Sequence, residues 1–531
     1  MILPNLTETG KGTIDSVEFK GYNHTETAGD GEFYDMMNLS GDLYPVLTTR
    51  KPRGKVRKLT KPNGLLGKEK LCWCDGGEFY YGDEKIADVE DGEKTLCGMS
   101  AYICVFPDKI IYNISTGEVT EIEESFEAAG SVKYESSYLT DTDLDATGQT
   151  YVKITADGIG TKFNIYDTVF LEGSVIEELN TSKTIQDKGD DYILIIGAID
   201  EEKTQTGGLK IKRKCPDMDF VCEHDNRLWG CSSANHEIYC CKLGDPLNWY
   251  SYEGLSTDSY AVTVGSDGKF TGCASFLGYI MFFKETRVHK ILGSRPANFT
   301  LSTNSIRGPE EGSPKGLTSV NEMLYYKGRT DILANAGSMP ESVSFALGET
   351  EYTKTVAGYY KNKLYMSMLN TAENAYNMFV FDMKRNFWYR EDNIQALFMT
   401  ELGGQLYYID ASDNYIKTIE GNENEYIEWY GEFGEFSGNI ENKKYISRIN
   451  IDAWVAEKSY MDIFISYNNS PNGEDEYGRW EKIYTIHKMV RKNVNIPIIL
   501  RRCERFKLKI AGKGDFKLYR ITKQIATGSE V

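Results

Sequence analysis

Histidine and proline are scarce in this chain, and several common sequence signals are missing. The 531 residues include only five histidines, so general acid–base catalysis by imidazole has few candidates. No run of 18 apolar residues occurs, and we expect no transmembrane span. The first residues, MILPNLTETGKG, have neither a basic nor an apolar signal region, so we expect no signal peptide and synthesis in a cytoplasm.

Motifs of common enzymes and cofactor sites are also missing. We find no Gly-x-Ser-x-Gly element, no Walker loop and no dinucleotide fingerprint. The Ser-x-Asp-x-Gly-x-x-Trp box of sialidase propellers is absent, and Ser466–Trp480 is only a loose echo of it. With 79 acidic residues, a carboxylate pair of the glycosidase type arises easily by chance. We therefore predict that the protein is not an enzyme and binds no cofactor.

The 11 cysteines include no Cys-x-x-Cys pair, and we expect reduced, mostly buried thiols. The nearest approach to a zinc site is Cys231, His236, Cys240 and Cys241. Zinc needs ordered ligand spacing, and two consecutive cysteines on one strand point to opposite faces. This pattern predicts a buried hairpin, followed by a turn at GDPLNWY in which glycine supplies a free φ.

A second metal candidate is DTDLDATG, Asp141–Gly148, which begins like a calcium loop. Ala146 stands where that loop needs glycine, and Val152 stands where it needs a bidentate glutamate. We expect a solvated acidic loop here and predict no metal site in the chain.

The formal net charge is −19, which makes the chain a poor general binder of nucleic acid. Two stretches are basic: Arg50–Lys61 has seven basic residues and no acid, and Arg491–Lys523 has 11 basic and two acidic residues. They could be solvated sheet faces, docking surfaces for acidic neighbouring subunits, or contacts to phosphates. Within RFKLKI, alternation puts Arg505, Lys507 and Lys509 on one face and Phe506, Leu508 and Ile510 toward the core.

The chain is rich in aromatic residues and in glycine, with 36 Tyr, 23 Phe and 50 Gly. This composition favours strands and turns. Short aromatic strands and turns recur, as in GGEFYYGDEKIADV, LGYIMFFKETRVHKIL and GGQLYYIDASDNYIKTI. Equivalent positions lie 44, 40 and 42 residues apart, from Ile280 to Leu324, Leu364 and Leu406. A strand repeat of this period predicts an all-β fold with a β-propeller of six to seven blades.

The repeat defines the expected domains. Residues 1–60 read as an extended N-terminal arm, 61–130 as the first blades and 214–424 as the remaining blades. Between them, 131–213 has a strand–turn rhythm of its own and predicts an inserted small β-barrel or sandwich. Alternating strands over 425–531 predict a C-terminal β-sandwich.

Three segments resemble bacteriophage tail β-propeller proteins, namely the tail nozzle (tail tubular protein B) and packaged-DNA stabilisation proteins. In that family an Arg-Leu/Val-Trp-Gly strand precedes a Gly-Asp-Pro-x-Asn-Trp/Phe turn. The matching residues here are Arg227, Leu228, Trp229, Gly230, Gly244, Asp245, Pro246, Asn248 and Trp249. The segments Gly31–Pro52 and Gly512–Val531 resemble the opening and the ending of such proteins.

The resemblance implies a structural virion protein of the tail, assembled in the host cytoplasm. It would form a homo-oligomeric ring, such as a hexamer, and contact other tail proteins. Genomic DNA would pass through the ring without sequence-specific binding, since an acidic wall repels phosphates. Two alternatives stay open: a tail-tip adhesin that binds host surface glycan, and a propeller glycoside hydrolase.

Overall fold

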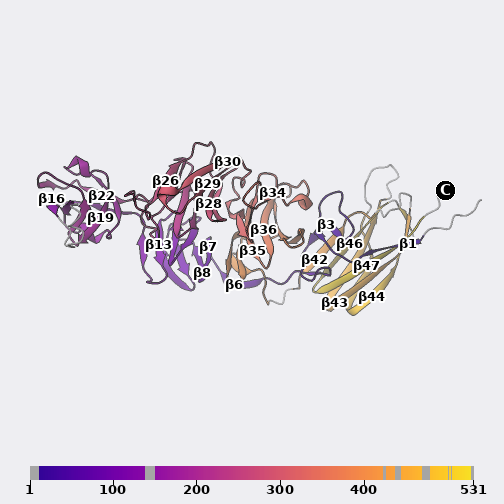
Figure 1. The fold of residues 1–531 in the computed structure, drawn as a ribbon. Coiled ribbons are helices and arrows are strands. Elements are labelled where there is room, and N and C mark those ends of the chain that lie inside the picture. Colours follow the sequence, from indigo (N-terminus) through magenta and orange to yellow (C-terminus); the bar gives the residue numbers. More distant parts are fainter. Residues whose placement is uncertain are drawn as a thin grey trace, which may run out of the picture. The chain divides into compact units, whose positions relative to one another are not determined.

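A computed structural model describes residues 11–137, 150–422, 426–436, 444–468, 479–499, 501–503 and 505–527 (Figure 1). This part of the chain is all-β, as the sequence predicts. Its only helices are short 3-10 turns: η1 (Ile159–Thr161), η2 (Glu177–Leu179), η3 (Pro296–Asn298), η4 (Pro314–Gly316) and η5 (Phe345–Leu347). None of the described helices is long and apolar enough to cross a membrane.

The chain forms two compact units. The central unit comprises 61–314 and 337–339, and the terminal unit comprises 1–60, 315–336 and 340–531. The two are described separately below.

The central unit contains four antiparallel four-stranded blades among its described residues. Blade 1 is β7 (Pro62–Lys68), β8 (Lys70–Asp75), β9 (Glu78–Tyr81) and β10 (Glu84–Asp88). Blade 2 is β11 (Thr95–Met99), β12 (Tyr102–Phe106), β13 (Ile110–Asn113) and β14 (Val119–Glu121). Blade 3 is β23 (Phe220–His224), β24 (Arg227–Ser232), β25 (Glu237–Cys240) and β26 (Tyr260–Thr263). Blade 4 is β27 (Gly272–Phe276), β28 (Tyr279–Lys284), β29 (Arg287–Leu292) and β30 (Thr300–Asn304).

Consecutive blades of the central unit share apolar layers. The first strands of the blades, β7, β11, β23 and β27, contact one another in that order. Between blades 3 and 4, for example, Trp229 and Cys231 pack with Ile280 and Phe282. A single four-stranded sheet cannot bury both of its faces, whereas stacked blades can, which explains the aromatic repeat.

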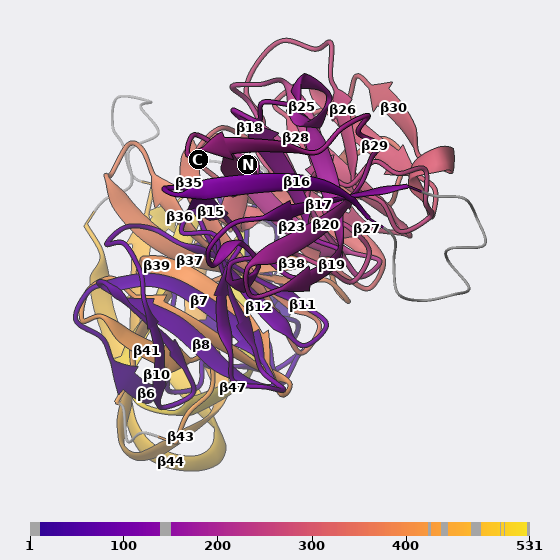
Figure 2. The same cartoon turned by 90° about the vertical axis from the view of Figure 1, so that its left-hand side faces the viewer.

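The terminal unit holds three further blade-like meanders. The first is β31 (Thr318–Val320), β32 (Met323–Lys327), β33 (Ile332–Asn335) and β34 (Glu341–Ser342). The second is β35 (Tyr352–Tyr360), β36 (Lys363–Asn370), β37 (Ala375–Asp382) and β38 (Phe387–Asp392). The third is β39 (Ala396–Leu402), β40 (Gln405–Asp410) and β41 (Tyr415–Thr418), completed by β6 (Gly54–Lys58) from the N-terminal part (Figure 2).

The fold is a β-propeller, as the repeat spacing predicts. Six of its meanders are separate four-stranded sheets in the described chain, and the seventh, β35–β38, continues into a larger sheet. This agrees with the predicted six to seven blades. The first two hairpins of the sequence repeat, which lie close together, form separate blades.

The insertion follows blade 2 and has a core of its own. Its eight described strands form one hydrogen-bonded sheet. They are β15 (Glu124–Glu127), β16 (Ser131–Ser137), β17 (Tyr151–Thr155), β18 (Thr168–Glu172), β19 (Ser182–Gly189), β20 (Tyr192–Ile196), β21 (Lys203–Thr206) and β22 (Lys210–Arg213). Val152, Ile154, Ile193 and Ile195 are among its buried core residues. The insertion thus begins with β15, earlier than the expected start at 131.

Strands of the N-terminal residues 1–60 pair with the C-terminal strands. The described C-terminal strands are β42 (Glu428–Phe433), β43 (Lys444–Tyr467), β44 (Glu481–Pro497), β45 (Arg502–Cys503), β46 (Phe506–Lys513) and β47 (Phe516–Thr527). The N-terminal strands β1 (Lys11–Ser16), β2 (Gly21–Tyr22), β3 (Glu32–Met37), β4 (Leu39–Ser40) and β5 (Leu47–Thr49) join them. Together with β35–β38 they form one 15-stranded sheet.

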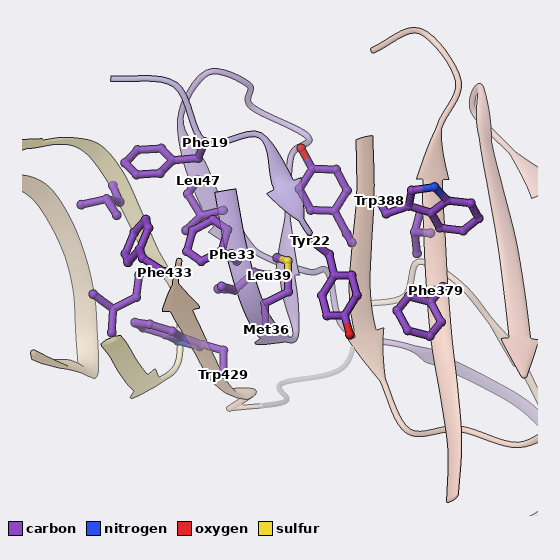
Figure 3. Close-up of a cluster of buried hydrophobic side chains, with 14 of the residues drawn as sticks. Phe19, Tyr22, Phe33, Met36, Leu39, Leu47, Phe379, Trp388, Trp429 and Phe433 are labelled. Carbon is purple, nitrogen blue, oxygen red and sulfur yellow. The ribbon is translucent and has the colours of Figure 1, made fainter. Parts of the chain in front are cut away.

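An aromatic core explains why these distant segments fold together. Phe33 of β3 packs on Phe433 of β42 with ring centroids 4.5 Å apart (Figure 3). Tyr22 of β2 lies against Phe379 of β37 at 5.3 Å, in an edge-on arrangement. All these rings are at least 96% buried. Burial of large aromatic side chains is the main stabilising term available to such a sheet.

Candidate functional site

The cysteine-rich stretch of blade 3 is packed structure. Cys240 belongs to the apolar layer shared with blade 4, and Cys241 belongs to the layer shared with blade 2. The two side chains therefore diverge, as expected for consecutive residues of a strand. His236 is exposed in the turn between β24 and β25. Among the described residues, no three His, Cys, Asp or Glu side chains are grouped as a metal site would need.

Burial also makes several cysteine thiols of the chain, in blade 3 and elsewhere, poor nucleophiles. It raises the pKa of Cys72, Cys74, Cys97 and Cys240 to about 12. Only the thiolate reacts, and at pH 8 a pKa of about 12 leaves roughly one thiol in 10,000 ionised, against about a quarter for a free cysteine.

We expect iodoacetamide at pH 8 to label these four cysteines at least about 1,000-fold more slowly in the folded protein than in urea. Peptide mass spectrometry after timed labelling measures the rates. The half-buried Cys273 serves as the internal comparison. Fast labelling of Cys240 in the folded protein would contradict the packing described here.

The buried side chain of Arg227, on β24, supports the loop that follows β25. Its side chain is 1% exposed. Nη1 donates to the carbonyl oxygens of Cys241 at 2.8 Å and Asp258 at 2.6 Å, and Nη2 donates to that of Ser256 at 3.0 Å. A buried guanidinium needs several acceptors, and here backbone carbonyls supply them. The arginine of the Arg-Leu-Trp-Gly strand therefore fixes the loop 242–259.

The Gly-Asp-Pro-Leu-Asn-Trp segment forms the predicted turn. Gly244 has φ +72°, a value that glycine adopts without steric cost. Asp245 accepts hydrogen bonds from the Leu247 amide at 3.0 Å and from Asn248 Nδ2 at 2.6 Å. Trp249 is 1% exposed, and its Nε1 donates to the Pro246 carbonyl at 2.9 Å. Burial raises the pKa of the Asp245 carboxyl, although the bond from Asn248 opposes this shift.

This turn fastens the insertion to the propeller. Asn248 Oδ1 accepts from the Thr168 amide at 2.8 Å, and Nδ2 lies 3.3 Å from Asp167 Oδ1. Asp167 pairs with Arg213 at the end of β22. We call Asp167, Thr168, Arg213, Asp245 and Asn248 the buried joint.

Arg213 ties the same joint to blade 2. Its Nε donates to the Ile122 carbonyl at 2.9 Å and Nη2 to the Glu121 carbonyl at 2.8 Å. Arg213 is 3% exposed and Asp167 is 2% exposed. The sequence reading identified Asp245 and Asn248 through the turn motif but missed Asp167, Thr168 and Arg213. No spacing pattern connects these residues, because their contacts are long-range.

Two of the seven basic residues of Arg50–Lys61, Arg50 and Arg53, are buried in ion pairs, whereas Lys51, Lys55, Lys58 and Lys61 are exposed. Arg53 is 7% exposed, and its Nη2 lies 3.0 Å from Glu391 Oε2 and 2.8 Å from Asp392 Oδ2. Arg50 is similarly buried, 3.6 Å from Asp392. Of the interpretations left open for this stretch, none anticipated a buried ion-pair cluster.

The C-terminal basic stretch follows the predicted alternation. Phe506, Leu508 and Ile510 are at most 2% exposed, and the intervening basic residues lie on the other face of β46. Many of its charges have carboxylate partners. These pairs include Arg491–Asp452 (3.0 Å), Arg505–Glu435 (3.2 Å), Lys513–Glu428 (3.0 Å) and Lys523–Asp30 (2.7 Å).

Two sequence candidates lie outside the described residues. The acidic loop Asp141–Gly148 is one of them. The other is Ser466–Trp480, the segment that loosely resembles the sialidase box, of which residues 469–478 lie outside the described residues.

Comparison with known proteins gives this chain no family. No family model matches it, and no curated protein matches it significantly. Among solved structures, BamB from Moraxella catarrhalis aligns with a TM-score of 0.33 and 10% identity, over 70% of this chain and 97% of that one. An exo-β-1,3-galactanase from Phanerochaete chrysosporium aligns with a TM-score of 0.21 and 9% identity, over 56% and 92%. Likenesses this low carry no functional argument, and the fold assignment depends on the sheet topology.

Proposed function

We propose that the protein is a structural component of a bacteriophage tail, assembling as a multi-copy ring around the DNA exit channel. It would be made and assembled in the host cytoplasm, and DNA would pass without sequence-specific binding. The sequence resemblance suggests the tail, and the buried joint gives that motif a mechanical role. The observation that best supports assembly is the unpaired edge of strand β44, among the residues that the structure describes.

Strand β44 is a long edge strand. It has 17 residues and pairs with β43 on one side, and no described strand pairs with its other edge. Val490 on this strand is 80% exposed and Tyr484 is 42% exposed; Ile499, just beyond it, is 80% exposed. Monomeric proteins keep such edges short or covered, because an open edge accepts another strand. We infer that a neighbouring subunit covers this edge.

Charge favours a second copy of the same chain as the neighbour. The exposed side chains of β44 include Lys482, Lys488, Arg491 and Lys492. The insertion, residues 124–213, carries 17 acidic and nine basic residues. A basic edge on one copy and an acidic insertion on the next make a heterologous contact, which generates rings or filaments. The local ion pairs of β44, such as Lys488–Glu457, are exposed and cost little to exchange.

The test is mass photometry of the purified chain and of Val490→Asp. We expect oligomers for the wild type that dissociate as salt rises from about 0.1 to 1 M, over which the Debye length falls from about 10 to 3 Å. Val490→Asp should be monomeric at all salt concentrations, because it places an acid on the docking edge. Val17→Asp, a change at a 49% exposed valine away from β44, is the matched control. A monomeric wild type at low salt, or unchanged assembly of Val490→Asp, would refute this surface.

A further inference from the structure

Five large apolar side chains are exposed where the insertion meets blade 3. Each is between 41% and 60% exposed, and together they comprise Ile165 and Tyr166 of the insertion and Leu243, Tyr252 and Leu255 of the loop after β25. Monomeric proteins seldom leave such a group of apolar side chains in solvent, and the group therefore indicates an interface. We call these five residues the blade 3 patch.

Short contacts connect the two halves of the blade 3 patch. Lys242 Nζ lies 5.8 Å from the centre of the Tyr166 ring. The next residue, Leu243, donates its amide hydrogen bond to the Thr257 carbonyl at 2.9 Å, two residues beyond Leu255. The insertion and the loop therefore present one continuous surface within the central unit.

The loop that carries Leu255 is held in place by buried hydrogen bonds. Arg227 donates to the carbonyls of Ser256 at 3.0 Å and Asp258 at 2.6 Å. Asp258 Oδ2 in turn accepts from the Leu255 amide at 2.9 Å. A loop that is already ordered loses little entropy when a partner binds, which favours binding at this surface.

An open pocket beside Leu255 has room for a side chain of a partner. Its volume is about 300 Å³, and it is lined by Tyr252, Leu255, Tyr260 and Pro296, among others. An apolar cavity of about 150 Å³ can hold benzene, so an aliphatic side chain such as valine fits this pocket.

We propose that the blade 3 patch binds the β44 edge of a second copy of this chain. The inference rests on the assembly proposal and names the surface that the edge meets on the next copy. Val490 projects from β44 and is 80% exposed, and the pocket beside Leu255 can bury it. A projecting apolar side chain on one copy and a pocket elsewhere on the next make a heterologous contact, which propagates into rings or filaments.

The charges of the two surfaces are complementary. The loop 243–259 has three acidic residues and no basic residue, and its Glu253 is exposed. Strand β44 has four basic residues and one acidic residue. The blade 3 patch also adjoins the acidic insertion, which the assembly proposal places against the basic edge. A second copy therefore matches both the apolar and the charged groups of this surface.

The test is sedimentation velocity of full-length variants, alone and mixed, at about 0.1 M salt, where charge interactions reach about 10 Å. Leu255→Arg should be monomeric, because it places a cation opposite the basic β44 edge. An equimolar mixture of Leu255→Arg and Val490→Asp should associate again, to dimers at least, because each copy supplies the surface that the other has lost. This rescue also shows that both variants are folded.

Two further variants complete the test. Tyr252→Ala, which introduces no charge, should raise the dissociation constant of the assembly about tenfold, because it removes an exposed aromatic contact. Leu277→Arg is the matched control, since Leu277 is a 47% exposed leucine elsewhere in the central unit. Its assembly should equal that of the wild type.

The outcomes separate this inference from the assembly proposal. If Leu255→Arg or Tyr252→Ala assembles like the wild type, or if the mixture does not associate, the blade 3 patch is not the partner surface. The assembly proposal then still stands, provided that Val490→Asp alone is monomeric. A monomeric wild type, or normal assembly of Val490→Asp, would overturn both.

Discussion

Arg213→Ala is expected to lower the free energy that holds the insertion in place by about 3–5 kcal/mol. In the native chain Arg213 neutralises Asp167 and donates to the Glu121 and Ile122 carbonyls. Both charged side chains are at least 97% buried. Truncating the arginine leaves a buried carboxylate without a counter-charge and two carbonyls without a donor, and this is the costly way to break an ion pair.

Hydrogen exchange measured by mass spectrometry reports this change locally. Amides of β18 and β22 should exchange more than about 100-fold faster in the variant, since each 1.4 kcal/mol is tenfold. Lys212→Ala is the control, because this neighbouring side chain is 43% exposed and its partner Glu172 lies 3.6 Å away. We expect Lys212→Ala to change stability by less than about 0.5 kcal/mol. Equal exchange in the two variants would show that Arg213 does not fasten the insertion.

Arg53→Met is expected to destabilise the terminal unit by about 3–5 kcal/mol at neutral pH. The guanidinium is the shared partner of Glu391 and Asp392, which are 3% and 6% exposed. It also donates to the Ile419 carbonyl at 2.9 Å. Methionine keeps the volume approximately but removes the counter-charge that Glu391 and Asp392 share, and only Asp392 keeps a second arginine, Arg50, at 3.6 Å.

The loss should depend on pH in a defined direction. Burial raises the pKa of Glu391 above its ordinary value even though Arg53 opposes this shift. A carboxyl with a raised folded pKa stabilises the fold below its unfolded pKa, about 4.3, and loses that contribution as the pH rises through the folded pKa. Without Arg53 the folded pKa rises further, so the deficit of the variant should shrink as the pH falls from 7 toward about 4.5.

Urea unfolding of wild type and variant across this pH range measures the difference. Lys51→Ala is the control, because Lys51 is 53% exposed and pairs with Glu420 at the surface. Its effect should be small at every pH. A deficit of Arg53→Met that is constant with pH would mean that the buried carboxylates are not its cause.

Most of the fold could be predicted from local patterns in the sequence. The spacing of aromatic strands gave the propeller, and alternation in β46 gave the buried set Phe506, Leu508 and Ile510 correctly. The Gly-Asp-Pro turn was also readable, because Gly244 and Asp245 act through neighbours only a few residues away. Such features depend on strand periodicity and turn chemistry, which short segments specify by themselves.

Features that depend on distant partners were not readable. Strand β6 pairs with β41, so Lys58 lies opposite Tyr415 although more than 350 residues separate them in the chain. The basic stretch beginning at Arg50 was interpreted as a surface, because composition does not show that its arginines pair with the buried Glu391 and Asp392. Asp167 and Arg213 were missed for the same reason, since each is one ordinary charged residue at a strand end.

The measurement that tests the central proposal most directly is electron microscopy of virions labelled with an antibody against this chain, together with negative-stain images of the purified protein. Assembly through β44 into a tail ring predicts label on the tail and ring-shaped particles in the free protein. Unlabelled virions together with a uniform monomer would contradict it.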